Sequence, residues 1–254
     1  MTTNFDKVIE FNKTFGLAHY DDEQRNVFDE NPKLANLRYS LIKEEIGELT
    51  EAFETHDFIE VIDALTDILY VVYGAASSFG FNINELYFNT DTSANSSKTI
   101  YENVLGKVPE FAPVHIGQKT VKEEFYNLSL ANHYLEKLQN LDANLFRMIQ
   151  ERNYDETKTV LLSTLMNTYL LGCYLGIDLN RSFDIVHSSN MSKVCANEDE
   201  AKFTVQWYKD NEERYDSPDY RLCYDNTRYV VFNKSTGKIL KNTKYVPANF
   251  DCMV

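Results

Sequence analysis

The chain has 254 residues, 43% of them hydrophobic, which is enough to bury a core in one large domain or two small ones. Its net charge of −14 and its pI of about 4.8 argue against nucleic acid or an anionic membrane as a main partner, because both are polyanions. Four widely spaced cysteines without a CxxC pair suit a reducing compartment, and neither a disulfide framework nor a zinc site.

The first residues, Met-Thr-Thr-Asn-Phe-Asp-Lys, lack the apolar core of a signal peptide. The most hydrophobic segment, 160–177, approaches the length of a membrane span but contains the polar residues Ser163, Thr164, Asn167 and Thr168. It is therefore interpreted as a buried core helix. The sequence predicts a soluble, cytoplasmic protein without a membrane partner.

Apolar periodicity predicts a helix over residues 4–16, followed by longer helices over about 33–54 and 57–79. The turn Thr55-His56-Asp57 is short, so the two long helices are expected to pack antiparallel. Gly80 stands where a helix C-terminal glycine belongs.

The two long predicted helices carry carboxylates at helical spacing. Residues three, four or seven positions apart share a helix face, which groups Glu45 with Glu48, and Asp63 with Asp67. Asp67 opens an apolar run and is expected to lie largely out of water, where a carboxylate must be protonated, paired or metal-bound. Since all these donors are oxygens, Mg²⁺ fits better than zinc, and Mn²⁺ is the alternative. Glu51, Glu54 and Glu60 fit a solvated helix face as well as a site.

A stretch with Pro109 and Pro113 is the best candidate for a linker, over residues 106–120. Helical patterning resumes from Val121 to about 150, restarts over 154–175, and returns briefly around Trp207. The segment Arg228–Lys241 predicts a β-hairpin with its turn near Ser235–Gly237.

The second half repeats landmarks of the first. Ser78-Phe-Gly-Phe-Asn-Ile-Asn84 matches Tyr174-Leu-Gly-Ile-Asp-Leu-Asn180, and Asn95-Ser-Ser-Lys98 matches Asn190-Met-Ser-Lys193 at nearly the same offset. We interpret this as an internal duplication of an all-α unit. The predicted segments are 1–105 with the acidic site, the linker 106–120, a degenerate copy over 121–200, and an extension with the hairpin over 201–254.

The two copies differ at the acidic positions. Glu60 corresponds to Glu156, but Asp63 corresponds to Thr159 and Asp67 to Ser163. The expected counterparts of Glu44, Glu45 and Glu48 are Glu123, Glu124 and Asn127. The second copy is therefore expected to supply the other wall of the bundle and few metal ligands.

With ExxE at Glu45–Glu48 and acids at 60, 63 and 67 on the next helix, the first copy resembles the all-α nucleoside triphosphate pyrophosphohydrolases. The run from Asp63 to Gly74 looks like the MazG-like or phosphoribosyl-ATP-pyrophosphohydrolase-like members. Residues 186–193 and the 237–241 tail are similar to the same group. One departure is that the family's ExxD motif ending at Asp67 would begin at Ala64, so Asp63 or Glu60 is expected to supply that ligand.

The resemblance implies a four-helix bundle, duplicated here into a single-chain pseudo-dimer. Whether two such chains associate as a homodimer is left open. It also implies Mg²⁺-dependent hydrolysis of a nucleoside triphosphate, or a related small-molecule nucleotide, to the monophosphate and pyrophosphate. Glu45, Glu48, Asp63 and Asp67, with Glu60 as an alternative, would hold metal, and Glu44 or Glu45 would accept a proton from water. Substrate contacts are expected from polar and basic groups: Arg38, Asn95, Lys98, Asn190 and Lys193.

Two other readings compete with this one. A di-iron bundle needs Glu-x-x-His motifs, and none of the five histidines follows a Glu at that spacing. A catalytically decayed nucleotide-binding or scaffold protein of the same fold stays open, since Ala64 breaks the ExxD motif.

Overall fold

The computed structural model describes residues 2–83 and 129–253. The chain divides into two compact units. One comprises Tyr20–Phe183 with Phe250–Val254, and the other comprises Met1–His19 with Asp184–Asn249.

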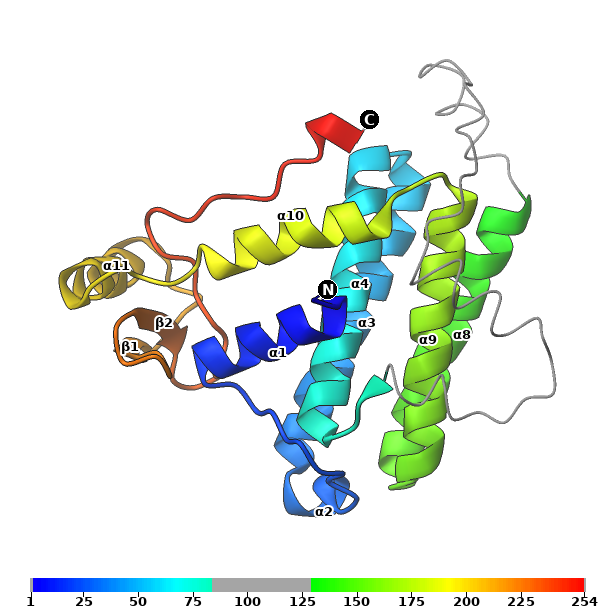
Figure 1. The fold of residues 1–254 in the computed structure, drawn as a ribbon, viewed down its shortest axis with the longest axis horizontal. Coiled ribbons are helices and arrows are strands. Elements are labelled where there is room, and N and C mark those ends of the chain that lie inside the picture. Colours follow the sequence, from blue (N-terminus) through cyan, green and yellow to red (C-terminus); the bar gives the residue numbers. More distant parts are fainter. Residues whose placement is uncertain (1, 84–128, 254) are drawn as a thin grey trace. The chain divides into compact units, whose positions relative to one another are not determined.

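The first unit contains two helical hairpins that lie side by side (Figure 1). Helix α3 (Pro32–Thr55) packs against α4 (Phe58–Phe79), and α8 (Ser129–Gln150) packs against α9 (Tyr154–Tyr174). Helix α4 contacts α9, and α3 contacts α8, which makes a four-helix bundle. The short helix α2 (Val27–Glu30) precedes α3, and a 3-10 turn, η2 (Asp251–Met253), also belongs to this unit.

Local sequence signals explain where the first hairpin begins and turns. Asn31 caps α3 by accepting a hydrogen bond from the Leu34 backbone N–H at 3.2 Å, and Pro32 occupies the first helical turn. His56 ends α3 in the left-handed conformation, and Asp57 caps α4 through the backbone N–H groups of residues 59 and 60. The predicted helices over 33–54 and 57–79 are confirmed.

The second hairpin repeats these features 96 positions later. Arg152 ends α8 with φ 56°, as His56 ends α3 with φ 59°. Asn153 caps α9 as Asp57 caps α4. Gly176 and Gly80 follow α9 and α4 with φ 71° and 77°. The duplication read from the sequence therefore has a structural counterpart in equivalent helix ends.

Core residues repeat at the same offset. The hydroxyl groups of Tyr73 and Tyr169 lie 3.1 Å apart, and these two residues are 96 positions apart in the chain. In a two-fold symmetric contact, a residue near the axis meets its own equivalent, which is the arrangement of this tyrosine pair. Further pairs at this offset are buried in both copies, among them Ile42 and Leu138, Leu49 and Leu145, Leu65 and Leu161, and Leu69 and Leu165.

This register corrects the counterparts expected for the acids of α3. Glu123, Glu124 and Asn127 lie outside the described residues. Counting from the equivalent helix ends, the positions that match Glu44, Glu45 and Glu48 are Asn140, Leu141 and Asn144 of α8. The second copy lacks acids at these positions too, so the predicted asymmetry between the copies is kept.

The second unit holds α1 (Asn4–Phe15), α11 (Glu198–Asn211) and a two-stranded sheet, and α10 (Leu179–Met191) runs from the first unit into it. Gly16 ends α1 in the left-handed conformation, as expected. A small core of Cys195, Ala201, Val205, Tyr208, Val231 and Leu240 joins α11 to the sheet.

The C-terminal hairpin is confirmed, but its pairing differs from the prediction. Strand β2 (Tyr229–Asn233) pairs antiparallel with β1 (Pro218–Leu222), which precedes it in the chain. The segment expected to pair with β2 makes one bridge, Phe232 with Ile239. Strand β1 was not predicted from the sequence, because proline and polar residues such as those around Pro218 are uncommon in a strand interior.

The two compact units differ in their bounds from the predicted segments. The four-helix bundle takes two helices from each repeat, so one unit contains helices of both repeats. The predicted linker 106–120 lies outside the described residues. All four cysteines are free. No single helix in the described ranges is long and apolar enough to cross a membrane, and α9 with α10 meets that test only as a pair bent by 113°.

Candidate active site

The acids of α3 and α4 meet along the first hairpin. The α3–α4 packing brings Glu45 close enough to the α4 acids for Asp67 and Asp63 to act on its ionisation. Asp63 and Asp67 are half-buried on α4, whereas Glu44, Glu48 and Glu60 are exposed. Asp67 is thus less enclosed than its apolar neighbours in the sequence suggested, because it lies at the border of the buried face.

Glu45 has the most perturbed ionisation among these acids. Burial, and then the negative charge of Asp67 and other nearby acids, raises the pKa of Glu45 to about 9. The other contributing acids are Glu48, Glu44 and Asp63. The Oε2 atom of Glu45 is buried without a hydrogen-bond partner among the described residues. Without a cation nearby, this carboxyl is expected to be protonated at neutral pH.

The ionisation of Glu48 is affected by the same group of acids. Burial and the charge of Glu44 raise the pKa of Glu48, and a hydrogen bond with the Glu45 side chain opposes that rise. The two carboxyls, one helical turn apart on α3, therefore titrate as neighbours and not independently.

The donor chemistry fits a hard divalent cation, although the ligands are not gathered around one point. All donors are carboxylate oxygens, and burial together with the repulsion of neighbouring acids raises the pKa of Glu45, which a nearby cation would oppose. Within residues 2–83 and 129–253, no three Asp, Glu, His or Cys side chains stand close enough together to hold a metal ion.

Arg38 was predicted as a substrate contact, and that role stays a prediction. Its side chain is buried, and Nε donates a hydrogen bond to the hydroxyl of Ser78 on α4 at 2.9 Å. Ser78 stands eleven positions beyond Asp67 on α4, so the guanidinium is directed away from the carboxylates.

The structure does not test the other predicted substrate contacts. Asn95 and Lys98 lie outside the described residues. Asn190 and Lys193 belong to the second compact unit, where the Lys193 ammonium donates to the Asn190 side-chain oxygen at 2.5 Å. Their roles in substrate binding stay predictions.

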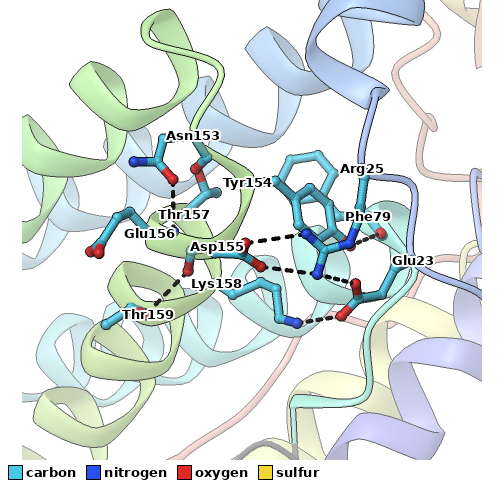
Figure 2. A network of polar contacts seen from close by, with 10 residues as sticks. All are labelled: Glu23, Arg25, Phe79, Asn153, Tyr154, Asp155, Glu156, Thr157, Lys158 and Thr159. Atoms are coloured by element: carbon cyan, nitrogen blue, oxygen red, sulfur yellow. Dashed lines mark hydrogen bonds and ion pairs between the residues drawn. The ribbon is translucent and has the colours of Figure 1, made fainter.

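A polar network that the sequence did not reveal ties the segment before α2 to the start of α9 (Figure 2). Arg25 forms two hydrogen bonds of 3.1 Å with Asp155 and an ion pair of 2.9 Å with Glu23. Lys158 pairs with Glu23 as well. Arg25 and Asp155 are 130 residues apart and Glu23 and Lys158 are 135 apart, so no local motif could have indicated this link between the two copies.

The same segment crosses the end of α4. The backbone N–H of Tyr20 donates to the Ser77 carbonyl at 3.0 Å, and that of Gln24 donates to the Phe79 carbonyl at 2.9 Å. The Tyr154 hydroxyl also donates to the Phe79 carbonyl, at 2.6 Å (Figure 2). The end of the acid-bearing helix is thus held by both copies, which limits how far α4 can shift.

Comparison with known proteins agrees with the fold and the acidic hairpin. A family model described as phosphoribosyl-ATP pyrophosphohydrolase matches residues 8–94, which include α3 and α4. An uncharacterized protein of Acanthamoeba polyphaga mimivirus is 37% identical over 250 residues, covering 98% of this chain and 94% of its own length. The chain belongs to the MazG-like all-α nucleoside triphosphate pyrophosphohydrolase superfamily.

The family match covers the first copy of this MazG-like chain and stops before α8. The mimivirus relative, in contrast, extends over both copies. No solved structure matches the chain. The family as a whole implies pyrophosphohydrolase chemistry and the use of divalent metals, which agrees with an all-oxygen cluster in the matched copy.

Proposed function

We propose that this chain is a Mg²⁺-dependent nucleoside triphosphate pyrophosphohydrolase with one catalytic site, on α3 and α4. The observation that carries the proposal is the cluster around Glu45, which exists in one copy only. Burial and then the charge of four neighbouring acids raise the pKa of Glu45 to about 9, and the second copy has Leu141, Asn144, Thr159 and Ser163 at four of the matching positions. Mn²⁺ is the alternative metal.

In this proposal Glu45, Glu48, Asp63 and Asp67 hold the metal ions, with Glu60 at the exposed end of the row. Bound divalent cations would neutralise the polyphosphate and activate a water molecule for attack at phosphorus. Glu45 would give up its proton when a cation binds, because a positive charge favours the carboxylate against burial and the neighbouring acids, which raise its pKa.

Glu44 is exposed beside Glu48 and is the proposed acceptor for the proton of the attacking water. The half-buried position of Asp63 and Asp67 excludes part of the solvent from one side of the site. This strengthens their attraction for a cation relative to a fully solvated carboxylate.

The rival function is a nucleotide-binding or scaffold protein without activity. It is favoured by one observation, that no three potential ligands converge in the described residues. An association of two chains and a cytoplasmic location also remain predictions.

The test is pyrophosphate release from a panel of ribo- and deoxyribonucleoside triphosphates with Mg²⁺. Glu48→Gln and Asp67→Asn are expected to reduce kcat/KM at least 100-fold, because each removes a charged ligand. The matched control is Glu156→Gln, which changes an exposed acid retained in the second copy and is expected to keep full activity. Nucleotide binding without any turnover, or turnover that survives both site substitutions, would contradict the proposal.

A further inference from the structure

Helix α11 carries two large aromatic side chains on the side that points away from its own core. Phe203 is 62% exposed and Trp207 is 39% exposed. They are four positions apart and are therefore neighbours on one face of the helix. The opposite side of α11 packs against the two-stranded sheet of the same unit through Ala201, Val205 and Tyr208 (Figure 1).

The packing of this unit does not use the two aromatic rings. In the described part of the chain, neither ring belongs to the hydrophobic cluster that joins α11 to the sheet. Single exposed apolar residues are ordinary, but two large rings side by side make a continuous apolar patch. Polar residues at positions 203 and 207 would give an amphipathic helix with the same buried side. The patch is therefore a feature that the fold does not require.

A carboxylate stands at each end of the aromatic pair. Asp199 lies one turn before Phe203, and Asp210 lies three positions after Trp207. Both acids are exposed, and neither forms an ion pair with any residue that the structure describes. Asp210 accepts a hydrogen bond from the neutral amide of Gln206 at 2.8 Å, which does not offset its charge. The outer face of α11 is thus apolar in the middle and negative at both ends.

The lysines of α11 do not neutralise these two acids. Lys202 pairs with Glu198 at 3.1 Å, one turn away on the same helix. Lys209 lies toward the sheet: a hydrogen bond from Lys234 and, less strongly, the charge of Lys209 lower the pKa of Asp219 on β1. The positive charges of the helix are therefore engaged away from the aromatic face.

The spacing of the acids defines what could cover the rings. Asp199 and Asp210 are eleven positions apart, which is about 16 Å along a helix axis. An amphipathic helix with lysine or arginine at positions i and i+11 places two positive groups at this separation and on one face. Apolar residues at i+4 and i+7 of that helix would lie between them and meet the two rings. Basic side chains also interact favourably with aromatic faces.

Other occupants fit the charge of this face poorly. In a two-fold pair of α11 helices, Asp199 of one chain would lie level with Asp210 of the other if the helices were antiparallel, and level with its own equivalent if they were parallel. Either arrangement brings like charges together at both ends. The same acids repel an anionic membrane surface or a phosphate group. Charge complementarity therefore favours a cationic partner.

We propose that the outer face of α11, formed by Asp199, Phe203, Trp207 and Asp210, docks a positively charged amphipathic helix of another protein. The aromatic pair supplies the apolar contact, and the two carboxylates set the register by pairing with basic residues. This face lies outside residues 8–94, which the family model matches. The proposal does not depend on the pyrophosphohydrolase activity proposed for α3 and α4.

The first measurement uses the fluorescence of Trp207, which is the single tryptophan of the chain and reports on this face without a label. The probe is a synthetic helical peptide of alanine, leucine and lysine, with lysines at i and i+11 and leucines at i+4 and i+7. Its titration into the full chain is expected to shift the emission to shorter wavelength and to saturate at one equivalent. A peptide of the same composition in scrambled order is expected to bind at least tenfold more weakly.

The second measurement compares variants of the chain. Phe203→Ser, and separately Asp199→Asn with Asp210→Asn, are expected to weaken binding of the amphipathic peptide at least tenfold. Phe203→Ser is expected to keep the melting temperature of wild type, because an exposed ring leaves no cavity. The matched control is Glu136→Gln with Glu156→Gln, which removes two exposed acids elsewhere and is expected to keep peptide binding.

Several results would overturn the proposal. Equal affinity for the amphipathic and scrambled peptides, or equal losses in the control pair and the asparagine pair, would assign binding to the overall negative charge. Sedimentation that shows self-association of wild type, abolished by Phe203→Ser, would assign the face to a second copy. A shift of Trp207 emission on vesicles of anionic lipid, equal to that with the peptide, would assign it to a membrane surface.

Discussion

At the scale of single residues, Glu45 makes the charge of the candidate site depend on pH. Its carboxyl lies half-buried among other acids, and its pKa of about 9 means that the folded, metal-free chain keeps a proton there. An unfolded chain would release that proton near the ordinary value of 4.5. The difference ties the stability of the fold to pH.

Between about pH 4.5 and pH 9 the folded state binds more protons than the unfolded state, so the stability of the metal-free protein is expected to fall as pH rises. The melting temperature, measured from pH 5 to pH 9 with a chelator, should decline over this window. Glu45→Gln should flatten the decline because glutamine does not titrate. Glu54→Gln, an exposed acid on the same helix, should keep it.

Addition of Mg²⁺ should reverse this behaviour, because the cation competes with the proton for Glu45. Apparent Mg²⁺ affinity is then expected to rise with pH up to about 9. An unchanged pH slope in Glu45→Gln would show that another group carries the linkage.

At the scale of elements, the two hairpins are built on the same helix ends but are surrounded differently. Gly80 and Gly176 both take positive φ, of 77° and 71°, which an L-residue adopts at a cost. A Cβ at Gly80 would also meet the Asp22 carbonyl oxygen at 1.8 Å, whereas a Cβ at Gly176 meets nothing within 4 Å. The close approach of the segment before α2 therefore requires glycine at position 80, whereas no neighbouring segment requires it at position 176.

Gly80→Ala is expected to destabilise the protein more than Gly176→Ala. The second substitution carries only the backbone cost of about 1 kcal/mol, while the first must also displace the chain at Asp22. Urea unfolding of both variants measures the difference. Equal losses would mean that the segment around Asp22 yields without cost.

At the scale of the whole molecule, the two repeats are interpreted as a pseudo-dimer within one chain. The tyrosine pair at 3.1 Å marks where an axis would pass, yet the acids stand on one side of it only. The second copy contributes packing, the Asp155 and Lys158 contacts to the segment before α2, and the hydroxyl of Tyr154 on the end of α4. Under the proposed function, the first copy carries the site and the second copy supports it.

A chain with one site should bind one nucleotide. Calorimetry with a nucleoside triphosphate analogue that resists hydrolysis, in the presence of Mg²⁺, is expected to give one equivalent per chain. Thr159→Ala with Ser163→Ala, at the positions that match Asp63 and Asp67, should leave affinity and stoichiometry unchanged. Two equivalents per chain would show that the second copy has kept a site of its own.

The amino-acid pattern alone determined the helices of both hairpins, the duplication and the candidate acids. Each of these depends on signals within a few turns of chain: apolar spacing, capping residues and carboxylates on one helix face. It could not place β1, whose proline and polar residues resemble a loop until β2 pairs with them.

Tertiary structure decided what those residues meet. Only the packing of α3 on α4 shows that burial and four neighbouring acids act on Glu45, and that Arg38 turns away from them toward Ser78. Burial and pKa depend on distances between groups far apart in sequence, such as Arg38 and Ser78, or Arg25 and Asp155. The sequence pattern contains no such distances. It located the acids, but it could not show that Arg38 is buried and bonded to Ser78.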